Sequence, residues 1–379
     1  MKFLALFSLL LLFATNCVNG NDETNAPDSP SGAANSYTYE TVTNAIDVPW
    51  GMTWLDDGSM LVSERRGSLH LLDEADGSLQ AIEGVPEVFD ENQGGLLDIM
   101  THPDYATNGW IYLTYSSTEG GGGSNTALMR ARLNDDRTRL VDKEVLYKAE
   151  PNTQRPFHFG SRIVFDNEGH VYFGIGDRGD RDTLPQDITI DGGKIYRLHD
   201  DGRIPEDNPF VGKEGVDAAF AYGIRNPQGM ALHPETGELW EHEHGPKGGD
   251  EINIIRAGKN YGWPVISYGV NYDGTEFAED TVRAGMEQPE WYWDPAIAPS
   301  GMVFVTSDRY PEWQGDILVG SLRYGYIVRA IVEDNTVVGD EILFEGIGRV
   351  RDIKQGPDGY LYVSTETDNG IVRIIPENS

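Results

Sequence analysis

The pattern of apolar and polar positions along the chain repeats one unit: a short apolar run, a polar turn and a second short apolar run. The clearest copy joins Arg162–Phe165 to His170–Ile175 through the turn Asp166–Gly169. Two such runs around Asp, Asn and Gly residues predict a β-hairpin. Six copies can be aligned, and their first strands are Gly51–Leu55, Leu96–Met100, Arg162–Phe165, Gly229–Leu232, Gly301–Val305 and Arg351–Lys354.

Each turn leads to a second strand, and a third strand often follows. The second strands are Met60–Ser63, Trp110–Tyr115, His170–Ile175, Glu238–Glu241, Asp316–Gly320 and Tyr360–Ser364. The third strands are Ser68–Leu72, Leu128–Leu133, Lys194–Leu198, Glu251–Ile255, Gly325–Ala330 and Ile371–Ile375. Strands at this spacing, with no long helix between them, indicate a β-propeller, whose four-stranded blades take about 40–50 residues each.

We therefore predict an all-β fold, a single six-bladed β-propeller of four-stranded antiparallel blades over residues 37–379. An eight-stranded barrel or a sandwich explains the repeated strand–turn–strand units less well. The early strand Tyr37–Thr43 is expected to join the last blade and close the ring.

The N-terminus has the pattern of an export signal, which we place at residues 1–20. Lys2 supplies the positive charge and Phe3–Phe13 an apolar stretch too short to span a bilayer. Cys17, the only cysteine of the chain, follows this stretch and precedes a flexible polar linker over residues 21–36. This layout resembles a bacterial lipoprotein signal ending before Cys17, whereas ordinary cleavage after Gly20 is the alternative. We expect an exported protein without a disulfide, either periplasmic or anchored by an N-terminal lipid, or otherwise secreted.

The net charge of the chain limits the classes of molecule that it is expected to bind. The formal net charge is −33, from 29 Lys and Arg against 62 Asp and Glu. So acidic a chain is not expected to bind nucleic acid or to be drawn to anionic lipid. The sequence does not indicate an oligomeric state.

In four of the six copies a polar residue stands where the first strand is entered, about eight residues before the turn. In a propeller these positions surround one mouth of the ring, so residues far apart in sequence should converge there. Arginines and amides at such a mouth suit a small polyanion, because guanidinium groups match carboxylates. The alternative is that the arginines pair with acids such as Asp98 and Asp352 and only hold blades together. The six positions are Pro49, Gln93, His158, Arg225, Pro299 and Arg349, with Asn226 and Arg351 beside two of them.

A second candidate site is the loop Glu243–Glu251. Its Gly and Pro residues expose backbone carbonyls, and Asp250 and Glu251 add carboxylates. Oxygen ligands of this kind favour calcium, although acidic Gly-rich loops are common. The nearby His242 and His244 have no matching third ligand for a transition metal.

Together these stretches resemble the soluble pyrroloquinoline quinone (PQQ)-dependent aldose sugar and glucose dehydrogenases over roughly residues 40–375. The motifs that carry the resemblance are Gln93–Leu97, His158–Arg162, Gly192–Lys194, Ile204–Phe210, Ala221–Gly229, Gly245–Asn253, Asn260–Pro264 and Arg349–Asp352. Phe157, where the glucose dehydrogenase branch has an aspartate, is more similar to the aldose sugar dehydrogenase branch. Arg323 is a second departure, because the glucose dehydrogenase branch has a lysine at this position.

The resemblance implies a role for each residue. His158 would be the general base, and Arg225 would polarise the quinone. PQQ would be held by Gln93, Arg225, Asn226, Arg323, Arg349 and Arg351. One calcium ion would bind the carbonyls of Gly245 and Pro246 together with PQQ, and a second, structural ion would bind Glu251 and the Tyr261 carbonyl.

The implied reaction is oxidation of an aldose at C1 to a lactone. Hydride would pass to PQQ while His158 takes the hydroxyl proton, and the electrons would go to an external acceptor. Since non-enzymatic relatives share this propeller, the alternative is a non-catalytic domain that binds a glycan or a protein. Aromatic loops such as Trp291–Trp293 could stack on sugars in that case.

Overall fold

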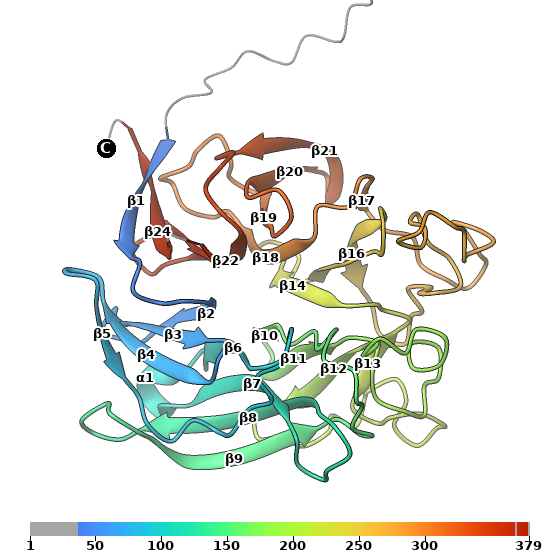
Figure 1. Ribbon diagram of the computed structural model, residues 1–379, viewed down its shortest axis with the longest axis horizontal. Helices are drawn as coiled ribbons and strands as arrows, with labels where there is room; N and C mark the ends of the chain where they lie inside the picture. Colours follow the sequence, from blue (N-terminus) through green and yellow to red (C-terminus); the bar gives the residue numbers. More distant parts are fainter. Residues whose placement is uncertain (1–36, 368–369, 378–379) are drawn as a thin grey trace, which may run out of the picture. The chain divides into compact units, whose positions relative to one another are not determined.

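The computed structural model describes residues 37–367 and 370–377. Their strands form six four-stranded antiparallel sheets placed as blades around a common axis (Figure 1). The predicted six-bladed β-propeller is therefore confirmed. The predicted signal and linker lie outside the described residues. Among the described residues, no helix is long and apolar enough to cross a membrane.

The blades follow one another along the chain. Blades one to three contain β2–β5 (Pro49–Trp54, Met60–Glu64, Ser68–Asp73, Ser78–Ala81), β6–β9 (Leu96–Thr101, Ile111–Ser117, Asn125–Leu133, Leu140–Lys148) and β10–β13 (Ile163–Phe165, His170–Ile175, Lys194–His199, Ala219–Tyr222). Blades four to six contain β14–β17 (Pro227–Leu232, Leu239–Glu243, Asp250–Ile255, Trp291–Trp293), β18–β21 (Pro299–Phe304, Ile317–Ser321, Ile327–Glu333, Thr336–Leu343) and β22–β24 (Val350–Gln355, Leu361–Thr365, Ile371–Pro376) with β1 (Tyr37–Thr43).

The N-terminal strand closes the ring. β1 is the outermost strand of blade six and pairs with β24 in a register that runs from Tyr37 opposite Pro376 to Thr43 opposite Ile371. This confirms the closure expected from the order of strands. Because the two ends of the described chain share one sheet, the last blade cannot form without both of them.

The apolar core lies between neighbouring sheets. Tyr112 and Leu128 of blade two pack with Phe173 and Tyr196 of blade three, and the rings of Phe173 and Tyr196 stack 5.1 Å apart. Every residue of β7 and of β11 is buried, whereas most of β9 is exposed or half-buried. A middle strand is covered on both faces by the adjacent blades, which explains its nearly continuous apolar sequence.

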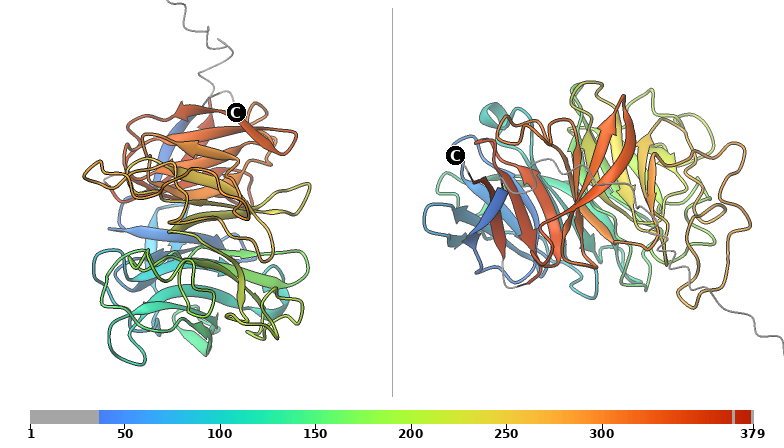
Figure 2. Two further views of the ribbon diagram at one scale, coloured as in Figure 1. Left: turned by 90° about the vertical axis from the view of Figure 1, so that its right-hand side faces the viewer. Right: turned by 90° about the horizontal axis from the view of Figure 1, so that it is seen from above.

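The outer strands of blades one to five were not located from the sequence, because their mixed burial weakens the apolar pattern. Trp110 and Arg162 precede the strands assigned to them, and a four-residue helix, α1 (Tyr105–Asn108), stands between β6 and β7. The long connections between strands project beyond the sheets in the side views of Figure 2.

Candidate active site

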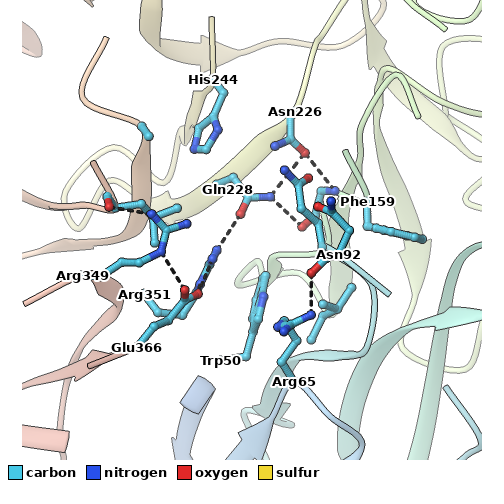
Figure 3. A pocket seen from close by; sticks show the side chains of 15 residues that line it. Trp50, Arg65, Asn92, Phe159, Asn226, Gln228, His244, Arg349, Arg351 and Glu366 are labelled. Carbon is cyan, nitrogen blue, oxygen red and sulfur yellow. Dashed lines mark hydrogen bonds and ion pairs between the residues drawn. The ribbon is translucent and has the colours of Figure 1, made fainter. Parts of the chain in front are cut away.

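Two adjoining cavities open where the first strands of the blades begin. The first, of about 330 Å³, is lined by Gln93, Asn226, Arg349 and Arg351 among other residues (Figure 3). The second, of about 490 Å³, is lined by Gln93, His158, Arg225 and Pro246 among others. Gln93 lines both, so the structure brings seven of the predicted site residues to one mouth.

β-Bulges turn side chains into the first cavity. The register between first and second strands shifts at Trp50 in blade one, at Gln228 in blade four and at Arg351 in blade six. A bulge leaves one residue outside the ladder and re-aims its side chain. All three of these residues line the first cavity. The hairpin pattern could not reveal the shift, because the bulge depends on pairing between strands.

The first cavity has a surplus of positive charge. It is lined by Arg65, Arg349 and Arg351 against one acid, Glu366. The two carboxylate oxygens of Glu366 each accept a hydrogen bond, from Nε of Arg349 at 2.7 Å and from Nε of Arg351 at 2.7 Å (Figure 3). Burial alone would raise the pKa of Glu366, but Arg351 and Arg349 lower it to about 2. Glu366 thus stays ionised and fixes both guanidinium groups, leaving the cavity cationic.

Amides from blades three and four form the opposite wall. Oδ1 of Asn226 accepts from the Gly160 N–H at 3.2 Å, and Nε2 of Gln228 donates to the Gly160 carbonyl at 3.1 Å. Oε1 of Gln228 accepts from Arg351 at 3.1 Å. These hydrogen bonds link blades three, four and six where they line the first cavity.

In the second cavity His158 forms a dyad that was missed in the sequence. Its Nδ1 lies 2.6 Å from Oδ1 of Asp177, whose Oδ2 accepts from Nε1 of Trp263 at 2.9 Å. The His158 N–H donates to Oε1 of Gln93 at 2.8 Å. Asp177 comes two residues after β11, and in an antiparallel hairpin that strand end lies beside the start of the first strand, which His158 precedes. That adjacency is the sequence signal that could have found Asp177.

The dyad suits proton abstraction. Burial, followed by the charge of Arg225, holds the pKa of His158 below its usual 6.5 despite the opposing effect of Asp177. Burial alone would raise the pKa of Asp177, but its hydrogen bond to His158 and the nearby charges hold it below 3.8. A neutral imidazole that donates from Nδ1 presents an unprotonated Nε2, which is the form a general base requires.

Arg225 is buried beside the dyad. Its Nη1 donates to the His244 carbonyl at 3.0 Å, and its guanidinium lies 5.2 Å from the centre of the Trp263 ring. Its buried Nε has no hydrogen-bond partner among the described residues. A buried donor without a partner is costly in a protein alone, so this group is available to a ligand oxygen.

Arg323 is not brought to either cavity. Its Nη1 donates to the Ala296 carbonyl at 3.2 Å, and its guanidinium lies 5.0 Å from the Tyr324 ring centre. The adjacent Leu322, not Arg323, lines the first cavity. A role for Arg323 in holding a cofactor therefore stays a prediction without a geometric counterpart.

Three glutamates gather next to the mouth on strands β15 and β16. Glu243 pairs across the strands with Glu251, and Glu241 lies two residues from Glu243 on the same face. Burial, followed by repulsion from Glu243, raises the pKa of both Glu241 and Glu251 well above 4.5. Oε1 of Glu241 has no hydrogen-bond partner among the described residues. Such carboxylates fit a divalent cation, which would remove their repulsion.

The predicted metal residues lie on both sides of this cluster. Gly245, Glu251 and Tyr261 line one small pocket with Glu243, whereas Pro246 lines the cavity of His158. Within residues 37–367, no protein hydrogen bond reaches the carbonyl oxygen of Gly245 or Pro246. The loop is held instead through Asp250, which accepts from the Gly245 N–H at 2.7 Å. Glu243 lay at the start of the predicted loop but was not named as a ligand, and Glu241 was missed, although the alternation of the two within a strand was visible in the sequence.

Comparison with known proteins agrees with this site. The family model described as Glucose / Sorbosone dehydrogenase matches residues 46–374. The chain is 41% identical over 349 residues to "Aldose sugar dehydrogenase YliI" of Escherichia coli (strain K12), covering 90% of this chain and 94% of that protein. It is 26% identical over 454 residues to "Quinoprotein glucose dehydrogenase B" of Acinetobacter calcoaceticus, covering 97% and 94%.

Solved structures agree as well. The apo-form of the soluble aldose sugar dehydrogenase of Escherichia coli superimposes with a TM-score of 0.85 at 38% identity, over 90% of this chain and 99% of that one. The PQQ-bound aldose sugar dehydrogenase of Streptomyces coelicolor gives a TM-score of 0.74 at 26% identity, over 90% and 98%. The resemblance found in the sequence is thereby confirmed, and the chain belongs to the glucose/sorbosone dehydrogenase family.

Proposed function

We propose that this protein oxidises aldose sugars at C1 to lactones, using PQQ and calcium and passing electrons to an external acceptor. The observation that carries the proposal is the His158–Asp177 dyad, whose Nδ1–Oδ1 distance is 2.6 Å, beside an arginine-lined cavity. The names of the relatives and the PQQ-bound neighbour support it.

The residues of the first cavity fit PQQ. The cofactor carries three carboxylates, and the cavity offers Arg65, Arg349 and Arg351 with Glu366 as the one opposing acid. Guanidinium groups bind carboxylates through two parallel hydrogen bonds. Gln93, Asn226 and Arg225 would supply further donors at the mouth. When bound, PQQ would supply the quinone that accepts the hydride of C1, and with it the two electrons of the C–H bond.

His158 would take the proton of the anomeric hydroxyl at its Nε2. Asp177 keeps the other ring nitrogen protonated and stabilises the positive charge that the ring gains. The unpartnered Nε of Arg225 would donate to an oxygen that becomes negative, and such fixed donors stabilise the transition state most where water is excluded. The loop carbonyls of Gly245 and Pro246 would hold a calcium ion at the cofactor, and Glu251 with the Tyr261 carbonyl a structural ion.

The direct test is reconstitution. Purified apoprotein is mixed with PQQ and Ca²⁺, and reduction of a dye is followed with a panel of aldoses. We expect a change in the quinone spectrum and turnover of at least one sugar. Glycan binding without PQQ binding would favour the non-catalytic alternative, and no spectral change with no turnover on any sugar would overturn the proposal.

The pH dependence of turnover follows from the state of His158. The base must be neutral, and its pKa lies below 6.5 in the folded chain, so the neutral form persists to lower pH than in a free histidine. Turnover should fall only as the pH drops through that lowered value. The pH profile of kcat/KM checks this, and an acid limb centred well above pH 6.5 would contradict it.

Chelation should lower stability as well as activity. An ion that binds only the folded chain stabilises it, by about 2.7 kcal/mol when its free concentration is 100 times Kd. We expect a chelator to lower the melting temperature of the apoprotein and added Ca²⁺ to restore it. Glu251→Gln should weaken this thermal response more than it weakens PQQ binding, because Glu251 lines the small pocket and neither larger cavity.

The matched control is Glu276→Gln, an exposed glutamate in the connection between β16 and β17. It should keep the full thermal response to Ca²⁺. A melting temperature of the apoprotein that ignores both chelator and Ca²⁺ would refute the structural ion, while leaving the ion at PQQ to be tested by activity.

From the sequence we further propose export, with Cys17 as a lipid attachment site or cleavage after Gly20 as the alternative. Mass spectrometry of the mature N-terminus distinguishes these two outcomes.

A further inference from the structure

Arg178 is a fully buried cation beside the dyad, and none of the roles above uses it. It follows Asp177, has no exposed surface and adopts a left-handed backbone with φ of 52°. Among the described residues no carboxylate lies within ion-pair distance of it, and burial lowers its pKa to about 9 although the charge of the neighbouring Asp177 acts in the opposite direction. A buried charge without a paired acid is unfavourable for stability alone. Its contacts therefore need a functional explanation.

The guanidinium of Arg178 is surrounded by the segment that carries His158. Nη1 donates to the Phe157 carbonyl, and Nη2 donates to the Arg155 carbonyl at 2.9 Å. The group also lies 3.5 Å from the centre of the Phe159 ring. Contacts thus reach the residues on both sides of His158, and a planar fork of donors is what allows one side chain to make them.

The same guanidinium ties this segment to a rigid strand. Nη2 also approaches the Ser124 carbonyl at 3.3 Å, directly before β8 of blade two. The segment needs such support, because His158 has a φ of 58° and Ser161 a φ of 97°, conformations that L-residues rarely adopt. Without an anchor, the backbone would relax toward more favourable angles.

We propose that Arg178 is a positioning residue for the catalytic base: Asp177 fixes the imidazole of His158, and Arg178 fixes its backbone. This inference rests on the proposed function for the role of His158. The anchoring itself is a property of the apoprotein. A displacement of about 1 Å at a reacting group can lower the rate by about 10²-fold.

The first test is kinetic. In Arg178→Gln we expect kcat to fall by about 10–100-fold, with little change in KM or in PQQ affinity, because Arg178 lines neither cavity. Arg178→Lys keeps the positive charge but not the planar set of guanidinium N–H donors, so the kcat of this variant should also fall. In Arg178→Ala, added guanidinium ion should restore part of kcat. A folded Arg178→Gln variant with unchanged kcat would overturn the proposal, as would equal losses in kcat and PQQ affinity.

The second test needs no cofactor. Hydrogen–deuterium exchange of the apoprotein should become faster over residues 155–160 in Arg178→Gln and Arg178→Lys. The matched control is Arg130→Gln, which also removes a stacked arginine, 4.1 Å from the Trp110 ring centre in blade two, and should leave that segment unchanged. Unchanged exchange in both Arg178 variants would overturn the anchoring. If the wild-type protein oxidises no sugar, the proposed function fails, and exchange still decides the anchoring.

Discussion

Replacing His158 with alanine is expected to lower turnover by about 10²–10⁴-fold, the usual contribution of a positioned general base. The imidazole lines the second cavity with its Nδ1 held by Asp177 at 2.6 Å, so Nε2 is the ring nitrogen left to act as the proposed base. The affinity for PQQ should change little, because the arginines that would hold its carboxylates line the first cavity. Steady-state kinetics with a saturating aldose and a separate titration with PQQ measure the two effects.

Two further variants separate catalysis from packing. Asp177→Asn keeps the shape of the side chain that contacts His158 but removes its charge. The amide also favours a different tautomer of the His158 imidazole, so turnover should again fall strongly. His199→Ala removes a half-buried histidine of the same blade, on β12, which lines neither cavity, and should keep near-normal turnover. A His158→Ala variant that folds and turns over normally would falsify the assignment of the base. A variant that unfolds would instead assign His158 to packing.

The fold was predictable from sequence because the first and second strands of each blade carry local signals. In blade three, an apolar run and an Asp-Asn-Glu-Gly turn predict β10 and β11 from neighbouring residues alone. Even the closure of the ring by β1 followed from strand order. The outer strands of blades one to five did not follow from the sequence, because a strand such as β9 is mostly exposed or half-buried and polar side chains weaken its apolar alternation.

The convergence of side chains at the candidate site was predictable where it depends on position within a blade, as for Gln93, His158, Arg225 and Arg349, each of which precedes the first strand of its blade. It was not predictable where function depends on pairing between strands. Asp177 meets His158 across a hairpin, and the carboxylate of Glu366, directly after β23, reaches Arg349 and Arg351 at the start of β22. Arg323 follows the end of β19 closely in the chain, but the direction of its long side chain depends on the carbonyl to which it donates, that of Ala296.

The sequence also left open whether arginines of the inner strands bind a ligand or hold blades together, and the structure contains both kinds. Arg349 and Arg351 line the first cavity, whereas Arg162 is only 1% exposed on the axis of the ring. Nη1 of Arg162 lies 3.0 Å from Asp98 of blade two and 2.9 Å from Asp352 of blade six. Arg162 is therefore the residue to which the blade-holding alternative applies.

Arg162→Met is expected to lower the free energy of unfolding by about 3–5 kcal/mol, the cost of leaving a buried charge without its partner. Asp98 and Asp352 have no exposed side-chain surface, so water cannot replace the guanidinium. Burial already raises the pKa of Asp352 against the lowering effect of Arg162, and removing Arg162 should drive a carboxyl of this pair to bind a proton. Protonation removes the repulsion between the carboxylates of Asp98 and Asp352. The loss of stability caused by Arg162→Met should therefore be smaller at low pH than at neutral pH.

Denaturant unfolding of the wild type and of Arg162→Met at two pH values measures this difference in the free energy of unfolding. Two further variants serve as controls. Arg66→Met breaks an exposed ion pair with Asp47, whose side chains are 61% and 63% exposed, and should change stability by less than about 1 kcal/mol. Adding Asp98→Asn and Asp352→Asn to Arg162→Met removes both unpaired charges and should recover part of the loss, since the penalty comes from the stranded carboxylates and not from the missing contact alone. Equal losses in Arg162→Met and Arg66→Met would contradict this account. They would mean that the axis is hydrated enough to screen its charges, and that the blades are held by the apolar packing between sheets.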